Sequence, residues 1–309
     1  MKKEDFYRNA RRDLPGPLAG VRVIDATTAW AGPMASCLLA DYGADVIRVA
    51  MPGDQGATWQ PFIGGTSRSF AEETINRNKR SVAIDLRRPE GVETFLTLVT
   101  SADVVVENFK PGTLAGWGIG YDDCQKVKQD IVYLSVSGWG QFGPESQRPG
   151  YDPGALAHSG WMALNGEKEG SPSKAPTFLA DDLSGLHGAL AVLAALRHRD
   201  VTGEGQHVDV SLLDSIIYQS NGYLTLGATG DPLERWGSEV RVCAPTNCYE
   251  CSDGHVFLAL ILDSHWVRLT EVLGCPELGL DPRYLTCLLY TSDAADDMQC
   301  VDLGGRRII

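Results

Sequence analysis

The first half of the chain alternates short runs of β-branched residues with stretches whose apolar residues recur at helical spacing. In the stretch after Ala31, for example, Met34, Leu38 and Leu39 share one helix face. Strands are predicted at residues 21–25, 45–49, 81–86, 103–107 and 131–137, and helices at 31–42 and from Pro89 onward. This alternation predicts an α/β fold, with a parallel sheet covered by helices on both faces.

A longer helix and then a change of pattern mark the second half. Leucines at helical spacing predict a helix over about residues 182–199, and they are Leu183, Leu186, Leu190, Leu193 and Leu196. A strand at 207–212 and a helix from Leu213 follow. From Thr246 the pattern becomes a hairpin and a helix, predicted at 248–251, 256–260 and 265–273. We expect a second, smaller α+β domain there.

The predicted domain organisation has three parts. Residues 1–225 form the large α/β domain, and residues 226–286 begin the small domain, which we expect to be incomplete. Residues 287–309 open with a run, Cys287 to Asp296, that is similar to a translated sequencing adapter, and they show no apolar periodicity afterwards. We interpret them as a non-native tail. The alternative is a genuine, disordered terminus.

Composition argues against several classes of function. The net charge of the 309 residues is −13, and duplex affinity rests on Lys and Arg contacts to phosphate, so no nucleic-acid partner is expected. No apolar run approaches the roughly 20 residues of a membrane span. The segment from Met1 to Arg12 is charged and lacks the apolar core of a signal peptide. We therefore expect a cytoplasmic protein without a membrane partner.

The eight cysteines form no recognisable disulfide framework in a chain of this length. Cys248 and Cys251 make one C-x-x-C pair with Cys243 and His255 nearby, whereas a structural zinc site usually takes two matched pairs of ligands. Buried or incidental thiols explain these residues better. We therefore expect no metal site.

Gly138, Gly140 and Gly143 match the G-x-G-x-x-G pattern of dinucleotide-binding loops and follow a predicted strand. Pro144 comes next, and no helix is predicted at the third glycine, where that motif requires one. We interpret the glycines as a flexible loop beside a site. No tightly bound cofactor is expected.

Two short segments have the chemistry of a ligand site. The run Asn76–Ser81 contains Arg77, Lys79 and Arg80, which predicts an anion-binding patch on an acidic protein, with a solvated loop as the alternative. The segment Asn108–Gly112 follows a predicted strand, at the edge where open α/β sheets bind ligands.

Asp181 precedes the long helix, and two roles remain open for it. As an N-cap it would accept hydrogen bonds from the free amides of the first turn. As a carboxylate at a helix N-terminus it is stabilised as an anion and is able to act as a covalent nucleophile. Asp182 competes for either role.

Several motifs in a fixed order give the chain a specific resemblance over about residues 15–286. It resembles the family III coenzyme A (CoA) transferases, the carnitine/formyl-CoA transferase or CaiB/BaiF group. The matching segments are Pro17–Asp25, Ala31–Pro33, Leu39–Ile47, Asn76–Ser81, Val106–Phe109, Gly150–Asp152 and Asp181–Gly185. The resemblance implies a Rossmann-like large domain, a small domain and a homodimer of interlocked rings.

The resemblance also implies an enzyme that transfers CoA from an acyl-CoA to a small carboxylic acid through covalent aspartyl intermediates. It assigns the nucleophile to Asp181 rather than Asp182. The positions that match CoA contacts are Ala29, Ala31, Ile84, Asp85, Leu86, Arg87, Asn108, Phe109, Lys110, Arg148 and Tyr151. CoA and acyl-CoA are implied as substrates and not as tightly bound cofactors.

Three positions depart from the family pattern. Met51 and Gly116 stand where basic residues often serve the CoA phosphates or adenine, and Trp30 replaces the glutamine of formyl-CoA-type transferases. The alternative functions are an α-methylacyl-CoA racemase and an inactive CoA-binding fragment. Racemases carry a histidine where this chain has Tyr151, and an unperturbed tyrosine is a poor base at neutral pH. A transferase is therefore favoured.

Overall fold

The chain divides into two compact units in the computed structural model, which describes residues 2–8, 14–53, 63–65, 69–230, 232–240 and 243–284. The first unit comprises residues 1–161 and 174–228, and the second comprises residues 162–173 and 229–309. The second unit thus takes residues 162–173 from within the segment predicted to be the large domain. The predicted tail, residues 287–309, lies outside the described residues.

The first unit is built on a six-stranded sheet in which every strand runs parallel to its neighbours. The strand order is β3-β2-β1-β4-β5-β6, the doubly wound order of Rossmann folds. The bounds are β1 (Arg22–Ala26), β2 (Asp45–Ala50), β3 (Lys79–Ala83), β4 (Val104–Glu107), β5 (Val132–Ser137) and β6 (His207–Ser211). The order reverses between β1 and β4, so a ligand is expected beyond the carboxyl ends of these two strands. The predicted parallel α/β fold is confirmed.

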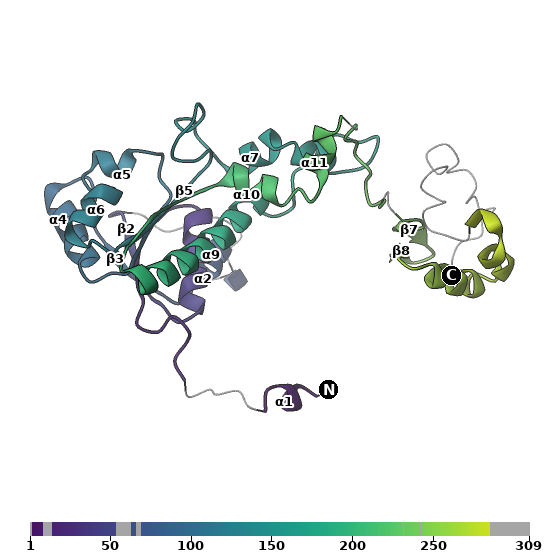
Figure 1. Cartoon of the computed structure of the whole chain (residues 1–309), viewed down its shortest axis with the longest axis horizontal. Coiled ribbons are helices and arrows are strands. Elements are labelled where there is room, and N and C mark those ends of the chain that lie inside the picture. The colour runs from purple at the N-terminus through teal and green to yellow at the C-terminus, as the bar shows by residue number, and fades with distance from the viewer. Residues whose placement is uncertain are drawn as a thin grey trace. The chain divides into compact units, whose positions relative to one another are not determined.

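Helices cover both faces of this sheet (Figure 1). On one face α2 (Ala31–Asp41) packs against α9 (Leu179–Thr202), which also contacts α7 (Asp152–His158) and α10 (Leu212–Tyr218). The other face carries α4 (Pro89–Val99), α5 (Thr113–Gly116) and α6 (Tyr121–Val127). The other helical segments described before residue 229 are α1 (Lys3–Phe6), η1 (Ile63–Gly65), α3 (Phe70–Ile75), α8 (Trp161–Leu164) and α11 (Tyr223–Ala228).

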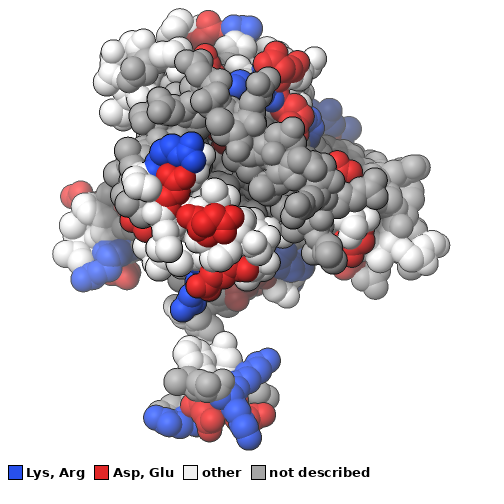
Figure 2. Space-filling view, turned by 90° about the vertical axis from the view of Figure 1, so that its right-hand side faces the viewer, with Lys and Arg blue, Asp and Glu red and all other residues white. Residues whose placement is uncertain are grey.

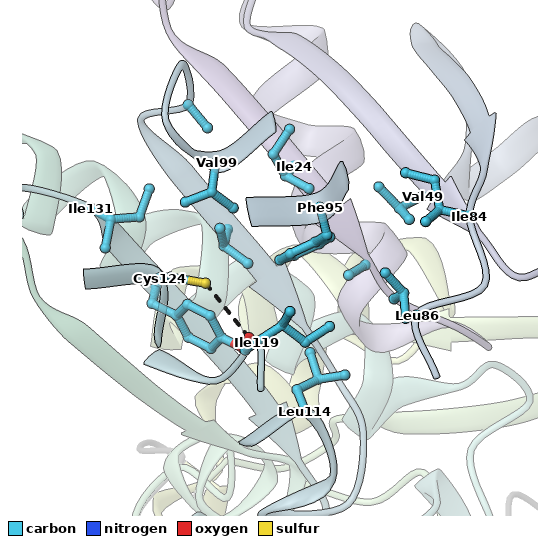
Figure 3. Packing of buried hydrophobic residues seen from close by; sticks show 14 residues of the cluster. Ile24, Val49, Ile84, Leu86, Phe95, Val99, Leu114, Ile119, Cys124 and Ile131 are labelled. Carbon is cyan, nitrogen blue, oxygen red and sulfur yellow. Dashed lines mark hydrogen bonds between the residues drawn. The ribbon is translucent and has the colours of Figure 1, made fainter. Parts of the chain in front are cut away.

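The core beneath α4 fixes the sheet. Phe95 of α4 is fully buried and lies among Ile24, Val49 and Leu86 (Figure 3). All residues of β4 and β5 are buried, as expected for central strands with helices on both sides. Replacing a core phenylalanine with alanine typically costs about 3–5 kcal/mol of unfolding free energy, so this cluster contributes strongly to the stability of the sheet.

α9 is a core helix, although by length and composition alone it qualifies as a membrane span. The uncharged stretch within it, residues 183–196, is shorter than the roughly 20 residues of a membrane span. The helix packs on α2, β5 and β6, and its small residues allow close approach. At Gly188, for example, a Cβ would lie 3.0 Å from Leu134 Cδ2 and 3.4 Å from Ala35 Cβ. Burial of one face against the sheet and α2 accounts for part of its apolar composition, whereas Leu186 and Leu190 are exposed.

The second unit contains the predicted hairpin and helix. β7 (Asn247–Cys251) pairs antiparallel with β8 (Gly254–Leu258), and α12 (Asp263–Val272), η2 (Pro276–Leu280) and η3 (Pro282–Tyr284) follow. Among the residues with described positions, no three His, Cys, Asp or Glu side chains converge as metal ligands do.

Candidate active site

Asn108, directly after β4, holds the loop that follows β1. Its side-chain oxygen accepts a hydrogen bond from the Thr28 amide at 2.8 Å, and its side-chain nitrogen donates to the Thr28 carbonyl at 2.7 Å. The next residue, Ala29, has a φ of 59°, in the left-handed region. Gly32 is needed beside them, because a Cβ there would lie 2.7 Å from Thr27 Cγ2 and 2.9 Å from Asn108 Cγ. These contacts therefore hold together the loops that follow β1 and β4, the two strands between which the strand order reverses.

All three segments that match CoA contacts early in the chain follow carboxyl ends of strands. Residues 29–31 follow β1, residues 84–87 follow β3, and residues 108–110 follow β4. Because the strands are parallel, these segments share one edge of the sheet. The structure thus brings these positions to the edge where a ligand is expected.

Within residues 84–87 the side chains differ in what they offer a ligand. Ile84 and Leu86 are 7% and 1% exposed and belong to the core, so their side chains are not available to a ligand. Arg87 pairs with Asp85, with its Nε 2.8 Å from Oδ1. In the next segment Phe109 packs edge-on against Trp117, with ring centroids 5.5 Å apart, and Lys110 is exposed.

Lys79 points into the protein and not toward a ligand. Its Nζ lies 2.7 Å from Asp25 Oδ2, and 2% of its side chain is exposed. It also donates to the Pro33 carbonyl and to Asn76 Oδ1. The prediction of an anion-binding patch that includes Lys79 is therefore wrong. β3 begins at this residue, which turns its side chain inward to neutralise a fully buried carboxylate.

The two arginines of the same run pair with acidic neighbours. Arg77 pairs with Asp41, and Arg80 pairs with Asp45. On the face drawn in Figure 2, basic and acidic side chains of the described residues lie intermixed. The run therefore makes two ion pairs through its arginines and one buried ion pair through Lys79, in place of the predicted cationic patch.

A carboxylate from another helix caps α9. Asp152 is 2% exposed, and its Oδ1 accepts a hydrogen bond from the Ala180 amide at 2.7 Å. The Asp181 amide donates to the same side chain. Because this cap comes from α7, α9 begins at Leu179, and Asp181 is the third residue of the helix. The interpretation of Asp181 as an N-cap is therefore wrong, and Phe178 stands at that position without a side-chain cap bond.

The environment of Asp181 favours a reactive carboxylate. Burial, followed by the negative charges of Asp152 and Asp182, raises the pKa of Asp181 to about 7. No hydrogen bond or ion pair joins its carboxylate to another residue within the described ranges. A carboxylate that is costly to ionise and free of protein donors is suited to attack a bound electrophile.

Asp182 has a protein partner. The indole Nε1–H of Trp30 donates to its Oδ1 at 2.7 Å. Trp30 is buried and packs against the rings of Phe178 and Phe70, with centroids 5.0 Å and 5.9 Å away. Gly185, one turn further along α9, lets the two helices meet, since a Cβ there would lie 2.7 Å from Met34 Cβ. The start of α2 and the start of α9 therefore lie side by side.

The glycines after β5 serve a backbone crossing. A Cβ on Gly138 would lie 2.4 Å from the Cα of Gly150, so neither position tolerates a side chain. Trp139 Nε1 donates to the Pro149 carbonyl and ties the same loop. No helix begins at Gly143, because the next helix, α7, starts only at residue 152. These glycines thus have a structural role that a dinucleotide loop would not explain.

Arg148 and Tyr151 lie in this loop, next to Asp152. The Arg148 guanidinium stands 6.0 Å from the Trp139 ring centroid and pairs with Glu145. Tyr151 is 71% exposed and occupies the N-cap position of α7. Sequence reasoning named both residues, but it gave no role to Asp152. The only signal for Asp152 was its place in the Gly150–Asp152 motif.

Comparisons with known proteins show which family the chain resembles. The family model described as CoA-transferase family III matches residues 18–296. The succinate–glutarate CoA-transferase of Agrobacterium fabrum is 38% identical over 288 residues, which cover 89% of this chain and 71% of the relative. The succinyl-CoA:glutarate CoA-transferase of Homo sapiens is 35% identical over 274 residues, which cover 87% of this chain and 62% of the relative.

Solved structures give the same result. A CaiB/BaiF family protein from Brucella suis has a TM-score of 0.81 at 34% identity, covering 91% of this chain and 76% of that chain. The protein Rv3272 from M. tuberculosis has a TM-score of 0.80 at 31% identity, covering 91% and 75%. The chain spans 62% to 71% of the length of the two curated relatives above. With its fold, its motifs and most of its length matched, the chain belongs to CoA-transferase family III.

Proposed function

We propose that this protein is an acyl-CoA:carboxylate CoA-transferase that works through covalent intermediates on Asp181. The observation that carries the proposal is the Asp181 carboxylate itself. It stands on the first turn of α9, partly buried, with a raised pKa and without a described protein partner, in a chain of this family. A carboxylate in this setting is suited to covalent catalysis.

The proposed cycle consists of four displacements. The Asp181 carboxylate attacks the donor thioester, the C–S bond breaks, and an acyl-aspartyl anhydride and CoA thiolate form. The thiolate then attacks the aspartyl carbonyl, which releases the donor acid and leaves an aspartyl-CoA thioester. The acceptor carboxylate attacks that thioester and gives a new anhydride and thiolate. Attack of the thiolate on the acceptor's acyl carbonyl forms the product and frees Asp181.

We propose succinyl-CoA as the donor and a second dicarboxylic acid as the acceptor. The relatives from Agrobacterium fabrum, Chloroflexus aurantiacus and Homo sapiens are named as CoA-transferases of succinate or succinyl-CoA with glutarate or L-malate. Trp30 stands where formyl-type enzymes have glutamine, which argues against a formyl donor.

The CoA contacts proposed for the assembled site are Ala29, Ala31, Ile84, Asp85, Leu86, Arg87, Asn108, Phe109, Lys110, Arg148 and Tyr151. We further propose a cytoplasmic homodimer without a nucleic-acid partner. Exposed apolar side chains on α9 and α10 support association: Leu186 is 52% exposed, Leu190 63% and Tyr218 76%. Exposed apolar residues grouped on neighbouring elements are typical of interfaces. Sedimentation of the protein tests this assembly.

One observation favours a second function, an α-methylacyl-CoA racemase. A carboxyl group with a pKa of about 7 is well matched to general acid–base work at neutral pH, and Asp181 has that value. Racemisation also requires a second acid–base group on the other side of the α-carbon, and Tyr151 stands where racemases carry histidine. Exchange of the α-hydrogen of an acyl-CoA for deuterium separates this function from CoA transfer, which does not require it.

Intact-mass spectrometry tests the transferase proposal. The protein is incubated with succinyl-CoA alone, without an acceptor acid, so that the aspartyl-CoA thioester accumulates. The expected result is an adduct whose mass equals CoA minus water and which peptide mapping places on Asp181. An adduct elsewhere, or CoA exchange between acids without any adduct, would contradict the mechanism.

A further inference from the structure

A row of buried polar side chains lies behind the turn that carries Asn108. Glu107, the last residue of β4, is 5% exposed, and its Oε2 accepts a hydrogen bond from the Phe109 amide at 2.7 Å. Its register partner on β5 is Ser135, which is 1% exposed and donates to the Glu107 carboxylate. Ser135 Oγ in turn lies 3.0 Å from His207 Nε2 on β6. The row therefore crosses three adjacent strands and ends on a ligand-facing turn.

A small cavity of about 70 Å³ adjoins this row. It is lined by Glu107, Ser135 and His207, and also by Lys110 and Gln141. Gln141 Nε2 is buried there without a hydrogen-bond partner in the described part of the chain. A polar cavity of this size has room for about two water molecules, so protons are able to reach the row.

One arrangement of protons satisfies the whole row when Glu107 is ionised. Ser135 has a single hydroxyl proton, and a bond from that hydroxyl lowers the pKa of Glu107. With the proton directed to Glu107, Ser135 Oγ accepts from Nε2 of His207. Burial lowers the pKa of His207, which keeps the ring neutral and consistent with this arrangement. Protonation of Glu107 removes the charge that the Phe109 amide faces.

We propose that the ionised Glu107 carboxylate is a positioning residue for CoA binding, because it anchors the Phe109 amide and so holds the turn at residues 108–110. Through Asn108 and its paired bonds to Thr28, the same anchor reaches the loop that carries Ala29. The charge matters because hydrogen bonds to ionised acceptors are shorter and about twice as strong as neutral ones. The inference rests on the proposed function, since the segments that Glu107 positions are the proposed CoA contacts.

The electrostatic surroundings place the protonation of Glu107 near neutral pH. The pKa of Glu107 is raised to about 7. Burial is the main cause and the negative charge of Asp209 adds to it, whereas the bonds from Ser135 and the Phe109 amide act in the opposite direction. The titratable groups around the row are Lys110 after β4, Tyr121 and Asp122 on α6, Tyr133 on β5, and His207 and Asp209 on β6. The anchor is therefore charged above neutral pH and uncharged below it.

Calorimetric binding of desulfo-CoA tests this inference, because that ligand has no thiol and cannot react at Asp181. The unsubstituted protein is expected to lose about three- to tenfold in affinity as the pH falls through about 7. Glu107→Gln is isosteric and uncharged, so it should bind about as weakly as the acidic form and show no such step. Its residual pH dependence measures the titration of the ligand's own phosphate.

Ser135→Ala is the second variant. It removes a bond that lowers the pKa of Glu107, so the step should move to higher pH, with full affinity recovered at about pH 9. Recovery at high pH would not occur if the substitution merely damaged the fold. If Glu107→Gln does not fold, this displacement of the step decides the question.

Two outcomes overturn the inference in distinguishable ways. Equal affinity and an equal pH step in the unsubstituted protein and Glu107→Gln would refute the positioning role alone. No binding of desulfo-CoA to the folded, unsubstituted protein would refute the proposed function and the inference together.

Discussion

Trp30 and Asp182, 152 positions apart in the sequence, are joined by a hydrogen bond of 2.7 Å between the indole Nε1–H and Oδ1. This bond lowers the pKa of Asp182 against the raising effect of its burial. No comparable bond acts on Asp181, whose pKa is raised by burial and by two neighbouring carboxylates. Two adjacent aspartates on one helical turn thus have different environments: Asp182 is bonded to Trp30, and the Asp181 carboxylate has no such partner among the described residues.

Replacing Asp181 with asparagine should abolish CoA transfer, with a loss of at least about a thousandfold, because the amide cannot form an anhydride at a useful rate. Asp182→Asn is the matched control. Its side-chain oxygen still accepts the Trp30 bond, so activity should fall by less than about tenfold. Steady-state transfer of CoA between two acids measures both. Near-normal transfer by Asp181→Asn would refute the residue assignment and the covalent mechanism.

Replacing Asp152 with asparagine should shift the pH dependence of transfer. Asparagine caps helices about as well as aspartate, so α9 should keep its start at Leu179. The negative charge that raises the pKa of Asp181 is removed, while burial still acts. In the proposed mechanism ionised Asp181 is the active form, so the acidic limb of the kcat profile, near pH 7 in the unsubstituted enzyme, should move to lower pH. An unmoved limb would mean that another group controls it.

The raised pKa of Asp181 also predicts a change of stability with pH. This carboxyl group has a pKa of about 7 in the folded protein against an ordinary value of 3.8. The folded state therefore binds the proton more tightly, and that contribution to stability is lost as pH rises from about 4 through about 7. The Asp181→Asn variant has no carboxyl group to ionise at this position, so it does not lose this stability as the pH rises. Its free energy of unfolding should exceed that of the unsubstituted protein at pH 8, and the difference should shrink toward pH 5.

Urea unfolding of both proteins at the two pH values measures this difference. Each pKa unit corresponds to about 1.4 kcal/mol, so the effect should amount to a few kcal/mol at most. A difference that is the same at pH 5 and pH 8 would show that Asp181 is not the titrating group.

The ion pair of Lys79 and Asp25 should be a major contributor to stability. Its side chains are 2% and 0% exposed, so Lys79→Met leaves a buried carboxylate unpaired and should cost about 3–5 kcal/mol. Arg80→Gln is the control on the same strand. That pair with Asp45 is exposed on the arginine side, at 65%, and its loss should cost about 1 kcal/mol or less. Similar urea midpoints for the two variants would contradict the structural role of Lys79.

Much of the fold was accessible from the sequence because its signals are local. The strands at β1, β2, β4 and β5 were predicted within one residue of their bounds, since buried parallel strands read as continuous apolar runs. β3 was predicted two residues late, because its first residues, Lys79 and Arg80, are charged. A strand at the edge of the sheet carries such residues without losing its pairing, so local composition gave the wrong start.

The site was predicted less completely, because its geometry depends on distant pairs. The start of α9 was placed at 182 since the cap was sought next to the helix, whereas it comes from Asp152. The inward direction of Lys79 depends on Asp25, which lies 54 positions earlier. Contacts between residues so far apart do not produce a periodic pattern in the sequence. Glu107 was read only as part of a motif, because the spacing of residues does not reveal which side chains a sheet places in one row.

The cap of α9 has a consequence for how the chain can be divided. Asp152 and Ala180 are separated by 28 positions, and the chain between them passes through residues 162–173, which belong to the second compact unit. The first turn of α9, which carries Asp181, is thus capped only when a loop that leaves the first unit has returned to it, at an entropic cost of closure. A polypeptide that ends at residue 228 would contain residues 162–173 but would lack residues 229–309, the rest of the second unit. The two units are therefore poor modules for exchange between proteins, even though each is compact.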